Sequence, residues 1–94
     1  MGKSFFALCK ELQKRYVDAY LAYCGSALIC RNPGAEERIN EELRPILRQF
    51  EEMVGARVID YLIDREGCQL RFENDEVLII DVVNREVFVE EENL

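Results

Sequence analysis

The sequence predicts an α+β fold in which an N-terminal two-helix hairpin packs on a C-terminal antiparallel β-meander of three to four strands. Two observations carry this prediction. Apolar residues recur every three or four positions as far as Gly55, as on one face of a helix, and alternate with polar residues after Ala56, as on a strand. The 94 residues are enough for one domain, 1–94, with a helical half at 1–55 and a β-meander half at 56–94.

The first helix is expected to begin after Ser4, a suitable N-cap, and to end between Cys24 and Ile29. Its apolar stripe consists of Phe5, Leu8, Cys9, Leu12, Tyr16, Ala19, Tyr20 and Tyr23. In the second half of the helix, Val17, Leu21 and Cys24 add apolar side chains on the opposite side. A helix that is apolar on two sides needs two packing partners.

In the second helix, Asn32 is expected as the N-cap and Pro33 as the first helical residue. The apolar stripe that follows consists of Ile39, Leu43, Ile46, Leu47, Phe50, Met53 and Val54. Pro45 lies inside this pattern and predicts a kink or break near Arg44. Gly55 is expected to end the helix.

Residues with period-two alternation predict four strands after Gly55. The strands are expected at Arg57–Asp64, Cys68–Glu73, Val77–Val83 and Glu86–Glu90. The intervening segments are short enough for hairpins, so the strands are expected to lie side by side in chain order.

Strand register decides which side chains share a face, because a slip of one residue reverses the whole strand. Short first and second hairpin loops would pair Ile63 with Leu70 and Phe72 with Val77. The core face would then consist of Ile59, Tyr61, Ile63, Cys68, Leu70, Phe72, Val77, Ile79, Val83 and Phe88. A three-residue first loop would instead place Asp60 opposite Phe72, and the apolar pattern favours the former register.

The same register leaves an aliphatic patch on the second face of the sheet. Together with the far side of the first helix, it forms the candidate interface, which consists of Val17, Leu21, Cys24, Leu78, Ile80, Val82, Val87 and Val89. Apolar patches of this size mark an interface or are covered by another element. We expect a homodimer, the commonest assembly. The alternative is an intramolecular cover, either the tail 91–94 or the first helix crossing to that face.

The net charge of −7 belongs entirely to residues 56–94, which contain eleven acidic residues and four arginines, whereas residues 1–55 are balanced. An acidic surface repels phosphate groups, so no direct nucleic-acid binding is expected. The asymmetry suits a basic partner or head-to-tail contact between copies. The simplest interpretation is that the charge keeps a small domain soluble.

The residue types that most active sites and metal centres need are scarce. The chain contains no His and no Thr, which excludes a Ser-His-Asp triad. Its four cysteines form no CxxC pair, so neither a zinc site nor a cofactor is expected. Without a recognisable signal peptide, we expect four free thiols in a reducing cytoplasm. The longest apolar stretch, 19–30, is too short to span a bilayer.

Asp81 is the residue that fits its predicted surroundings least well. The favoured register places it on the core face opposite Cys68, where it would cap the sheet edge or pair with Arg31 or Arg57. A small enzyme that uses Cys68 and Asp81 is the alternative, although a neighbouring carboxylate would raise the pKa of the thiol and make it a weaker nucleophile.

The sequence therefore predicts a small cytoplasmic protein–protein interaction module, an adaptor, regulator or inhibitor, that forms a homodimer and is not an enzyme. The first alternative is an acidic mimic of nucleic acid that inhibits a basic partner. The second is the small enzyme built on Cys68 and Asp81.

Overall fold

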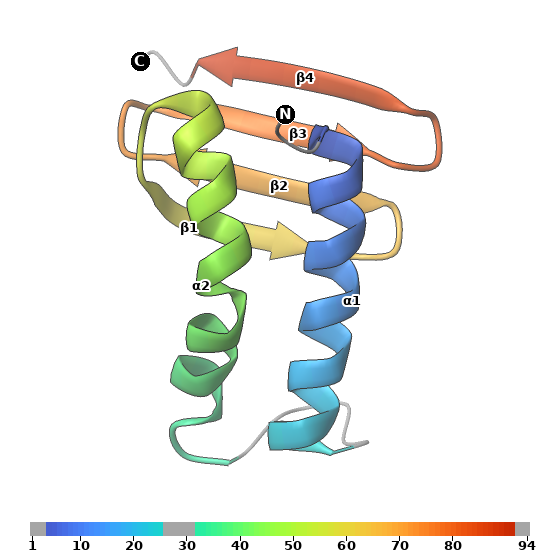
Figure 1. Ribbon diagram of the computed structural model, residues 1–94, viewed down its shortest axis with the longest axis vertical. Coiled ribbons are helices and arrows are strands. Elements are labelled where there is room, and N and C mark those ends of the chain that lie inside the picture. Colours follow the sequence, from blue (N-terminus) through green and yellow to red (C-terminus); the bar gives the residue numbers. More distant parts are fainter. Residues whose placement is uncertain (1–3, 26–31, 92–94) are drawn as a thin grey trace.

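The computed structural model describes residues 4–25 and 32–91. Two helices come first, α1 (Phe5–Cys24) and α2 (Ala35–Val54). They are followed by the strands β1 (Val58–Ile63), β2 (Gly67–Phe72), β3 (Glu76–Asp81) and β4 (Glu86–Glu91). The strands form one antiparallel sheet in the order β1-β2-β3-β4, which confirms the predicted α+β class and strand order (Figure 1).

The start of α1 is the one that its sequence predicts. The Ser4 hydroxyl accepts the backbone N–H of Ala7 at 3.2 Å, so it satisfies one of the free donors of the first turn. Gly25 follows the last helical residue with a positive φ of 68°, which suits a residue without a Cβ. The expected extension of the helix toward Ile29 lies outside the described residues.

The predicted start of α2 is wrong by two residues. Gly34, in the left-handed conformation, precedes the first helical residue Ala35, whose N–H donates to the Asn32 carbonyl at 3.2 Å. The Asn32 side chain donates to the Tyr23 carbonyl oxygen, so it ties the turn to the end of α1 instead of capping α2. Asn32 and Pro33 therefore form the turn between the helices.

Pro45 does not break α2, which continues from Ala35 to Val54 as one helix. Proline removes the N–H that would donate to the carbonyl of Glu41, but both residues are exposed, so water can satisfy that oxygen. Gly55 ends the helix as predicted, with a φ of 84° and its N–H bonded to the Glu51 carbonyl at 2.7 Å.

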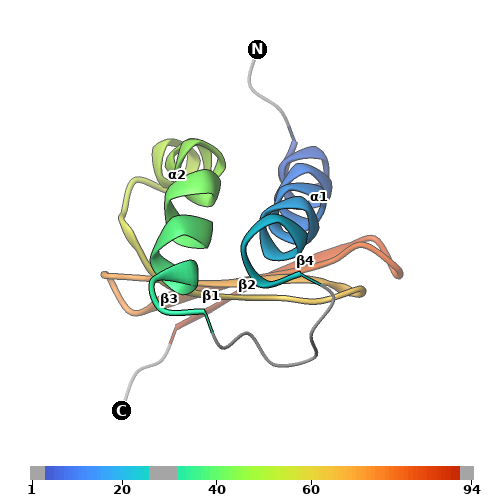
Figure 2. The same cartoon turned by 90° about the horizontal axis from the view of Figure 1, so that it is seen from below.

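Both helices lie on one face of the sheet, and no described helix covers the opposite face, which we call the open face (Figure 2). In Figure 1 the helices run across the strands and extend beyond β1, so the end of α1 and the start of α2 project past the sheet. Val17 and Leu21, in the second half of α1, are more than half exposed. The described residues provide no second packing partner for that side of the helix.

The two-residue loop of the first hairpin lies one residue earlier than in the favoured register, and the pairing also differs from that of the three-residue alternative. Ile63 pairs with Cys68 because the N–H of Asp64 donates to the Gly67 carbonyl at 3.0 Å, which leaves a two-residue loop, 65–66. The Asp64 carboxylate fixes this loop by accepting the N–H groups of Glu66 at 2.8 Å and Gly67 at 3.1 Å. Side chains with this local capping ability are typical of turns.

Gly67 is required at this turn by space as well as by conformation. A Cβ on Gly67 would overlap with the carbonyl oxygen of Ile80 on the neighbouring strand. Gly67 pairs with Asp81, so the lack of a side chain lets β3 approach β2 closely at this point.

The second hairpin reverses the faces of β3 relative to the prediction. A three-residue loop, 73–75, pairs Arg71 with Val77, and Asp75 takes a left-handed conformation with a φ of 67°. The N–H of Asp75 donates to the Phe72 carbonyl at 3.2 Å. This is the loop that combines a turn with one left-handed residue, and it shifts the expected Phe72–Val77 pair by one position.

As a result, the predicted surface position of Leu78 and Ile80 is wrong, since these side chains lie under the helices with exposed fractions of 2% and 1%. Val77 and Ile79, expected on the core face, have the parity of the open face. Val77 is nevertheless buried, with an exposed fraction of 3%, and Ile79 is half-buried. Of the other expected core residues, Ile59 lies at a bulge in β1, and Ile59, Val83 and Phe88 are exposed. The buried cluster consists of Leu8, Cys9, Leu12, Ala19, Cys24, Ala35, Ile39, Leu43, Ile46, Phe50, Cys68, Leu70, Phe72, Leu78 and Ile80.

Neighbouring isoleucines test this assignment of faces. Ile80→Ala should lower the free energy of unfolding by about 2–5 kcal/mol, because it leaves a cavity beneath the helices. Ile79→Ala on the open face should cost about 1 kcal/mol or less. Urea unfolding measures the free energy of unfolding of both variants. A larger loss for Ile79→Ala than for Ile80→Ala would contradict the observed register and favour the one expected from the sequence.

Candidate protein-binding interface

The outer edge of the sheet at β4 exposes three consecutive apolar residues. Val87, Phe88 and Val89 have exposed fractions of 37%, 47% and 62%. β4 pairs with β3 alone, and the helices mainly contact β1, β2 and β3, so β4 lies at the margin of the packed layer (Figure 1). We call Val87, Phe88 and Val89 the β4 patch.

The β4 patch points to both sides of the sheet. Val87 and Val89 pair with Ile80 and Leu78, so they share the face that the helices cover. Phe88 pairs with Ile79 on the open face. A strand added beside β4 would therefore bury apolar side chains above and below the sheet.

Carboxylates flank the patch at both ends. Glu86 and Glu90 are exposed and have the same side-chain parity as Phe88, so they belong to the open face. Charged residues on an edge strand discourage indiscriminate pairing with other strands. The edge therefore has an apolar centre between two negative charges, and these charges repel an acidic group placed opposite them.

The turn that presents β4 is held by Asp81. Its Oδ1 accepts the N–H groups of Val83 and Asn84, each at 3.0 Å, and its Oδ2 accepts the side-chain amide of Asn84 at 2.8 Å. The backbone N–H of Asn84, followed by its side-chain amide, holds the pKa of Asp81 below its ordinary value, because both stabilise the ionised form.

The predicted position of Asp81 opposite Cys68 is wrong. Asp81 pairs with Gly67, whereas Cys68 pairs with Ile80, so the two side chains lie on opposite faces of the sheet. The register shift in the second hairpin is the cause. Asp81 caps the turn after β3, whereas the simpler interpretation expected it to cap the sheet edge or to pair with an arginine. The structure does not bring it together with Cys68. The expected pairing with Arg31 lies outside the described residues.

The residues of the candidate interface expected from the sequence fall into two groups. Val17, Leu21, Val87 and Val89 are exposed, whereas Cys24, Leu78 and Ile80 are buried and Val82 is half-buried against the core. The structure places the first two on α1 and the next two on β4, so they do not form one patch. Phe88 was missed, because the expected register assigned it to the core, although its position between two valines on the last strand was the available signal.

Val17 lies in a shallow hollow of about 640 Å³ beside the first hairpin. Lys10, Lys14 and Arg65 line it together with Asp18 and other residues, so its charges are mixed. The hollow offers apolar contact without a clear charge preference.

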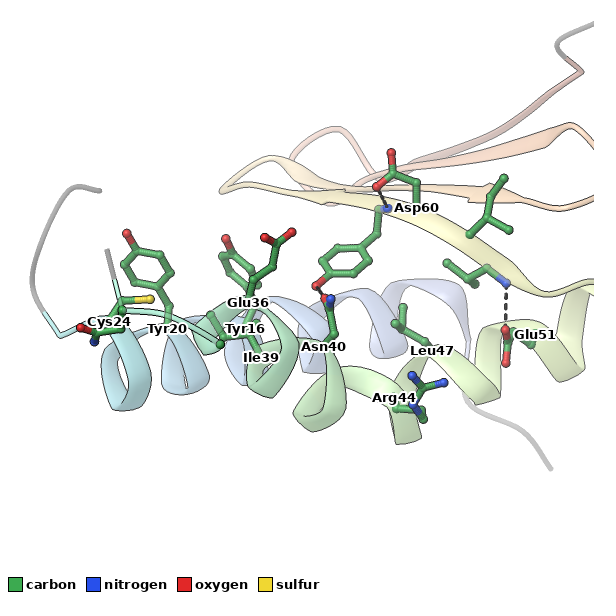
Figure 3. A pocket seen from close by; sticks show the side chains of 15 residues that line it. Tyr16, Tyr20, Cys24, Glu36, Ile39, Asn40, Arg44, Leu47, Glu51 and Asp60 are labelled. Atoms are coloured by element: carbon green, nitrogen blue, oxygen red, sulfur yellow. Dashed lines mark hydrogen bonds between the residues drawn. The ribbon is translucent and has the colours of Figure 1, made fainter. Parts of the chain in front are cut away.

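The opposite edge of the sheet, β1, adjoins a groove of about 760 Å³ beneath the projecting helices. Figure 3 shows Tyr16 and Tyr20 on α1 directed into the space that Glu36, Asn40 and Asp60 also border. The rings of Tyr16 and Tyr20 lie 6.1 Å apart. These tyrosines were expected in the core, and they pack against it while keeping part of their surface in the groove.

Tyr61 closes one side of the groove, and its hydroxyl donates to Oδ1 of Asn40. Burial, with further contributions from Tyr16, Glu36 and Asp60, raises the pKa of Tyr61 to about 12. The hydroxyl is therefore protonated near neutral pH and acts as a donor between β1 and α2.

Two N–H groups of β1 are already occupied by carboxylates (Figure 3). Glu51 accepts the N–H of Val58 at 2.8 Å, and Asp60 accepts that of Tyr61 at 2.9 Å. A strand added at β1 would have to displace these groups. Among the described residues no side chain caps an N–H of β4 in this way, so β4 is the more open edge.

The cysteines differ from the expectation of four free thiols. Cys9 and Cys68 are free and buried. Cys24 is disulfide-bonded, so the expectation is wrong for Cys24. Cys30 lies outside the described residues. Disulfides are uncommon in reducing compartments, so the disulfide at Cys24 does not support the expected cytoplasmic location, which stays a prediction.

Within residues 4–25 and 32–91, no three His, Cys, Asp or Glu side chains are grouped as a metal site would need. Neither of the two helices has the length and apolar character to cross a membrane. No protein-family model matches the chain, and no curated protein or solved structure matches it significantly.

Asp81→Ala should lower the melting temperature near neutral pH by releasing the turn before β4. The folded pKa of Asp81 is lowered. Its ionised form therefore contributes stability above the unfolded value of about 3.9, and this contribution is lost as the pH falls through the folded value. The difference in melting temperature between parent and variant should accordingly narrow below about pH 4.

Asp81→Asn is the control, because it keeps an acceptor for the turn but cannot titrate. Thermal unfolding followed by circular dichroism across the acid range compares the three proteins. A difference between parent and Asp81→Ala that stays constant with pH would contradict the proposed role of the ionised carboxylate.

Proposed function

We propose that the chain is a small protein–protein interaction module that pairs through the β4 edge, and that its partner is a second copy. The supporting observation is the β4 patch, three exposed apolar residues on an edge strand whose N–H groups no described side chain caps. Edge strands of this kind are templates for the addition of another strand.

The sequence of β4 favours a two-fold arrangement. Glu86-Val87-Phe88-Val89-Glu90 reads the same in both directions. Antiparallel pairing centred on Phe88 would place each Val87 opposite Val89 of the second copy and Phe88 opposite Phe88. A two-fold interface uses the same patch on both subunits, and this self-complementary strand meets that condition. The result would be a continuous eight-stranded sheet, two copies of the four-stranded one.

The same pairing would place Glu86 opposite Glu90 of the second copy. Like charges directly opposite one another on neighbouring strands oppose pairing, by roughly 0.2–1 kcal/mol each. The apolar residues at the centre of β4 are therefore expected to stabilise the dimer, and the opposed glutamates at the two ends of the patch are expected to weaken it. This opposition makes the proposed assembly sensitive to salt.

Val89→Glu should weaken self-association by about tenfold or more, because it replaces apolar contact with a further carboxylate. Leu62→Glu is the matched control, since Leu62 is 61% exposed against 62% for Val89 and lies on β1. Light scattering coupled to size exclusion distinguishes the 11.0 kDa chain from a species of twice that mass. Unchanged circular dichroism would show that both variants fold.

Raising the ionic strength from about 0.1 M to about 1 M shortens the Debye length from about 10 Å to about 3 Å. The parent dimer should become tighter as the opposed glutamates are screened, and Glu86→Gln with Glu90→Gln should remove most of that dependence. A parent that stays a monomer of 11.0 kDa at every concentration and salt would refute the homodimer. Equal weakening by Leu62→Glu would refute the β4 edge as its location.

A further inference from the structure

Two cysteines that are far apart in the chain meet in the core between α1 and β2. Cys9 lies in the second turn of α1 and Cys68 is the second residue of β2, 59 positions later. Their exposed fractions are 0% and 4%. The Cys68 Sγ donates to the Cys9 Sγ at 2.8 Å, and both thiols are free.

This separation is unusually short for two sulfur atoms that are not bonded. It exceeds the disulfide bond length of about 2.05 Å by about 0.8 Å. Even the smaller carbon atoms lie about 3.5–4.0 Å apart in ordinary contact. Leu8 and Leu12 on α1, and Leu70 on β2, are almost completely buried beside the pair, so the packing of the helix on the sheet holds the two sulfurs together.

We infer that Cys9 and Cys68 form a redox modification site, in which a small aliphatic disulfide such as oxidised glutathione converts the thiol pair into an intramolecular disulfide between α1 and β2. The inference does not depend on the β4 interface. It concerns the core between α1 and β2, whereas the β4 patch lies at the edge of the sheet, and its test detects a covalent bond.

The hydrogen bond assigns different roles to the two thiols. By donating to Cys9, Cys68 lowers the pKa of Cys9, while the same bond and burial raise the pKa of Cys68. Cys9 is therefore the thiol that ionises first and attacks, because the thiolate is the nucleophile in disulfide exchange. Cys68 is the thiol that resolves the intermediate.

The exchange proceeds in two balanced steps. The Cys9 thiolate attacks one sulfur of the small disulfide, whose S–S bond breaks, and the first small thiolate leaves and takes a proton from water. Cys68 then loses its proton to solvent and attacks the Cys9 Sγ, which releases the second small thiolate. Two protein thiols are oxidised, and one small disulfide is reduced to two thiols.

Burial controls the rate of the first step. Neither sulfur is accessible in the closed fold, so the reagent reaches Cys9 only when the first turns of α1 open locally. While α1 is still open, Cys68 can lose its proton to solvent and attack the mixed disulfide, and this second step is fast because it is intramolecular. The helix closes fully only after the second small thiol has left, since Cys9 has no exposed surface in the closed fold. The mixed disulfide should therefore accumulate little.

Peptide mapping tests the bond directly. The folded full chain is incubated with oxidised glutathione, remaining thiols are alkylated, and the protein is digested with trypsin. The expected product joins residues 4–10 to residues 66–71, because trypsin cleaves after Lys3, Lys10, Arg65 and Arg71. Cys24 and Cys30 both fall in peptide 16–31, so a bond between them cannot produce this species.

The crosslink should also raise the melting temperature by about 10 °C or more, since it closes a long loop in the unfolded chain. Cys68→Ser is the matched control, because its hydroxyl can still donate to Cys9 but cannot form the bond, and it should show no such rise. Recovery of only glutathionylated Cys9 or Cys68 would overturn the inference. So would an equal yield of the 4–10/66–71 product from protein unfolded in urea, because the fold would then contribute nothing to the pairing.

Discussion

The contact between the helix pair and a single face of the sheet is the constraint on which the other features depend. Because both helices lie on one side, only the strand residues of that parity can be buried, and Leu70, Phe72, Leu78 and Ile80 occupy those positions. The parity is set by two turns, which the Asp64 carboxylate and the left-handed Asp75 hold. A change of one residue in either loop would place a different set of side chains under the helices.

The same contact also decides what remains exposed. Two helices that run across the strands cover the middle of the sheet but reach past β1 and stop short of β4. The two edges consequently differ. At β1 the last turn of α2 brings Glu51 within reach of the Val58 N–H, and Asp60 caps Tyr61, so two N–H groups of this edge are already occupied. The helices contact mainly β1, β2 and β3, and the valines of the β4 patch keep much of their surface.

The core between the helices and the sheet contains a pair of reactive side chains, the thiols of Cys9 and Cys68. Cys9 and Cys68 are brought together from α1 and β2 by the packing of leucines on either side. A thiol pair in such a position is protected from reagents by the stability of the fold itself, since only local opening exposes it. The β4 edge and the thiol pair therefore depend on the same helix–sheet contact in opposite ways. The β4 patch is exposed because the contact does not extend over it, and the thiols meet because the contact packs α1 closely on β2.

The amino-acid sequence by itself determined the order of the helices and strands, and the change of period after Gly55, the Ser4 cap and the Gly55 stop correspond to observed boundaries. It placed the start of α2 two residues too early. It also placed Val87 and Val89 on a surface. Only the tertiary structure decided the register, because the turns at 65–66 and 73–75 depend on side-chain hydrogen bonds and on one left-handed residue. The four consecutive apolar residues of β3, 77–80, fit either face. It alone brought Cys9 to Cys68 and separated Asp81 from Cys68, because contacts between distant segments follow from packing and not from local pattern.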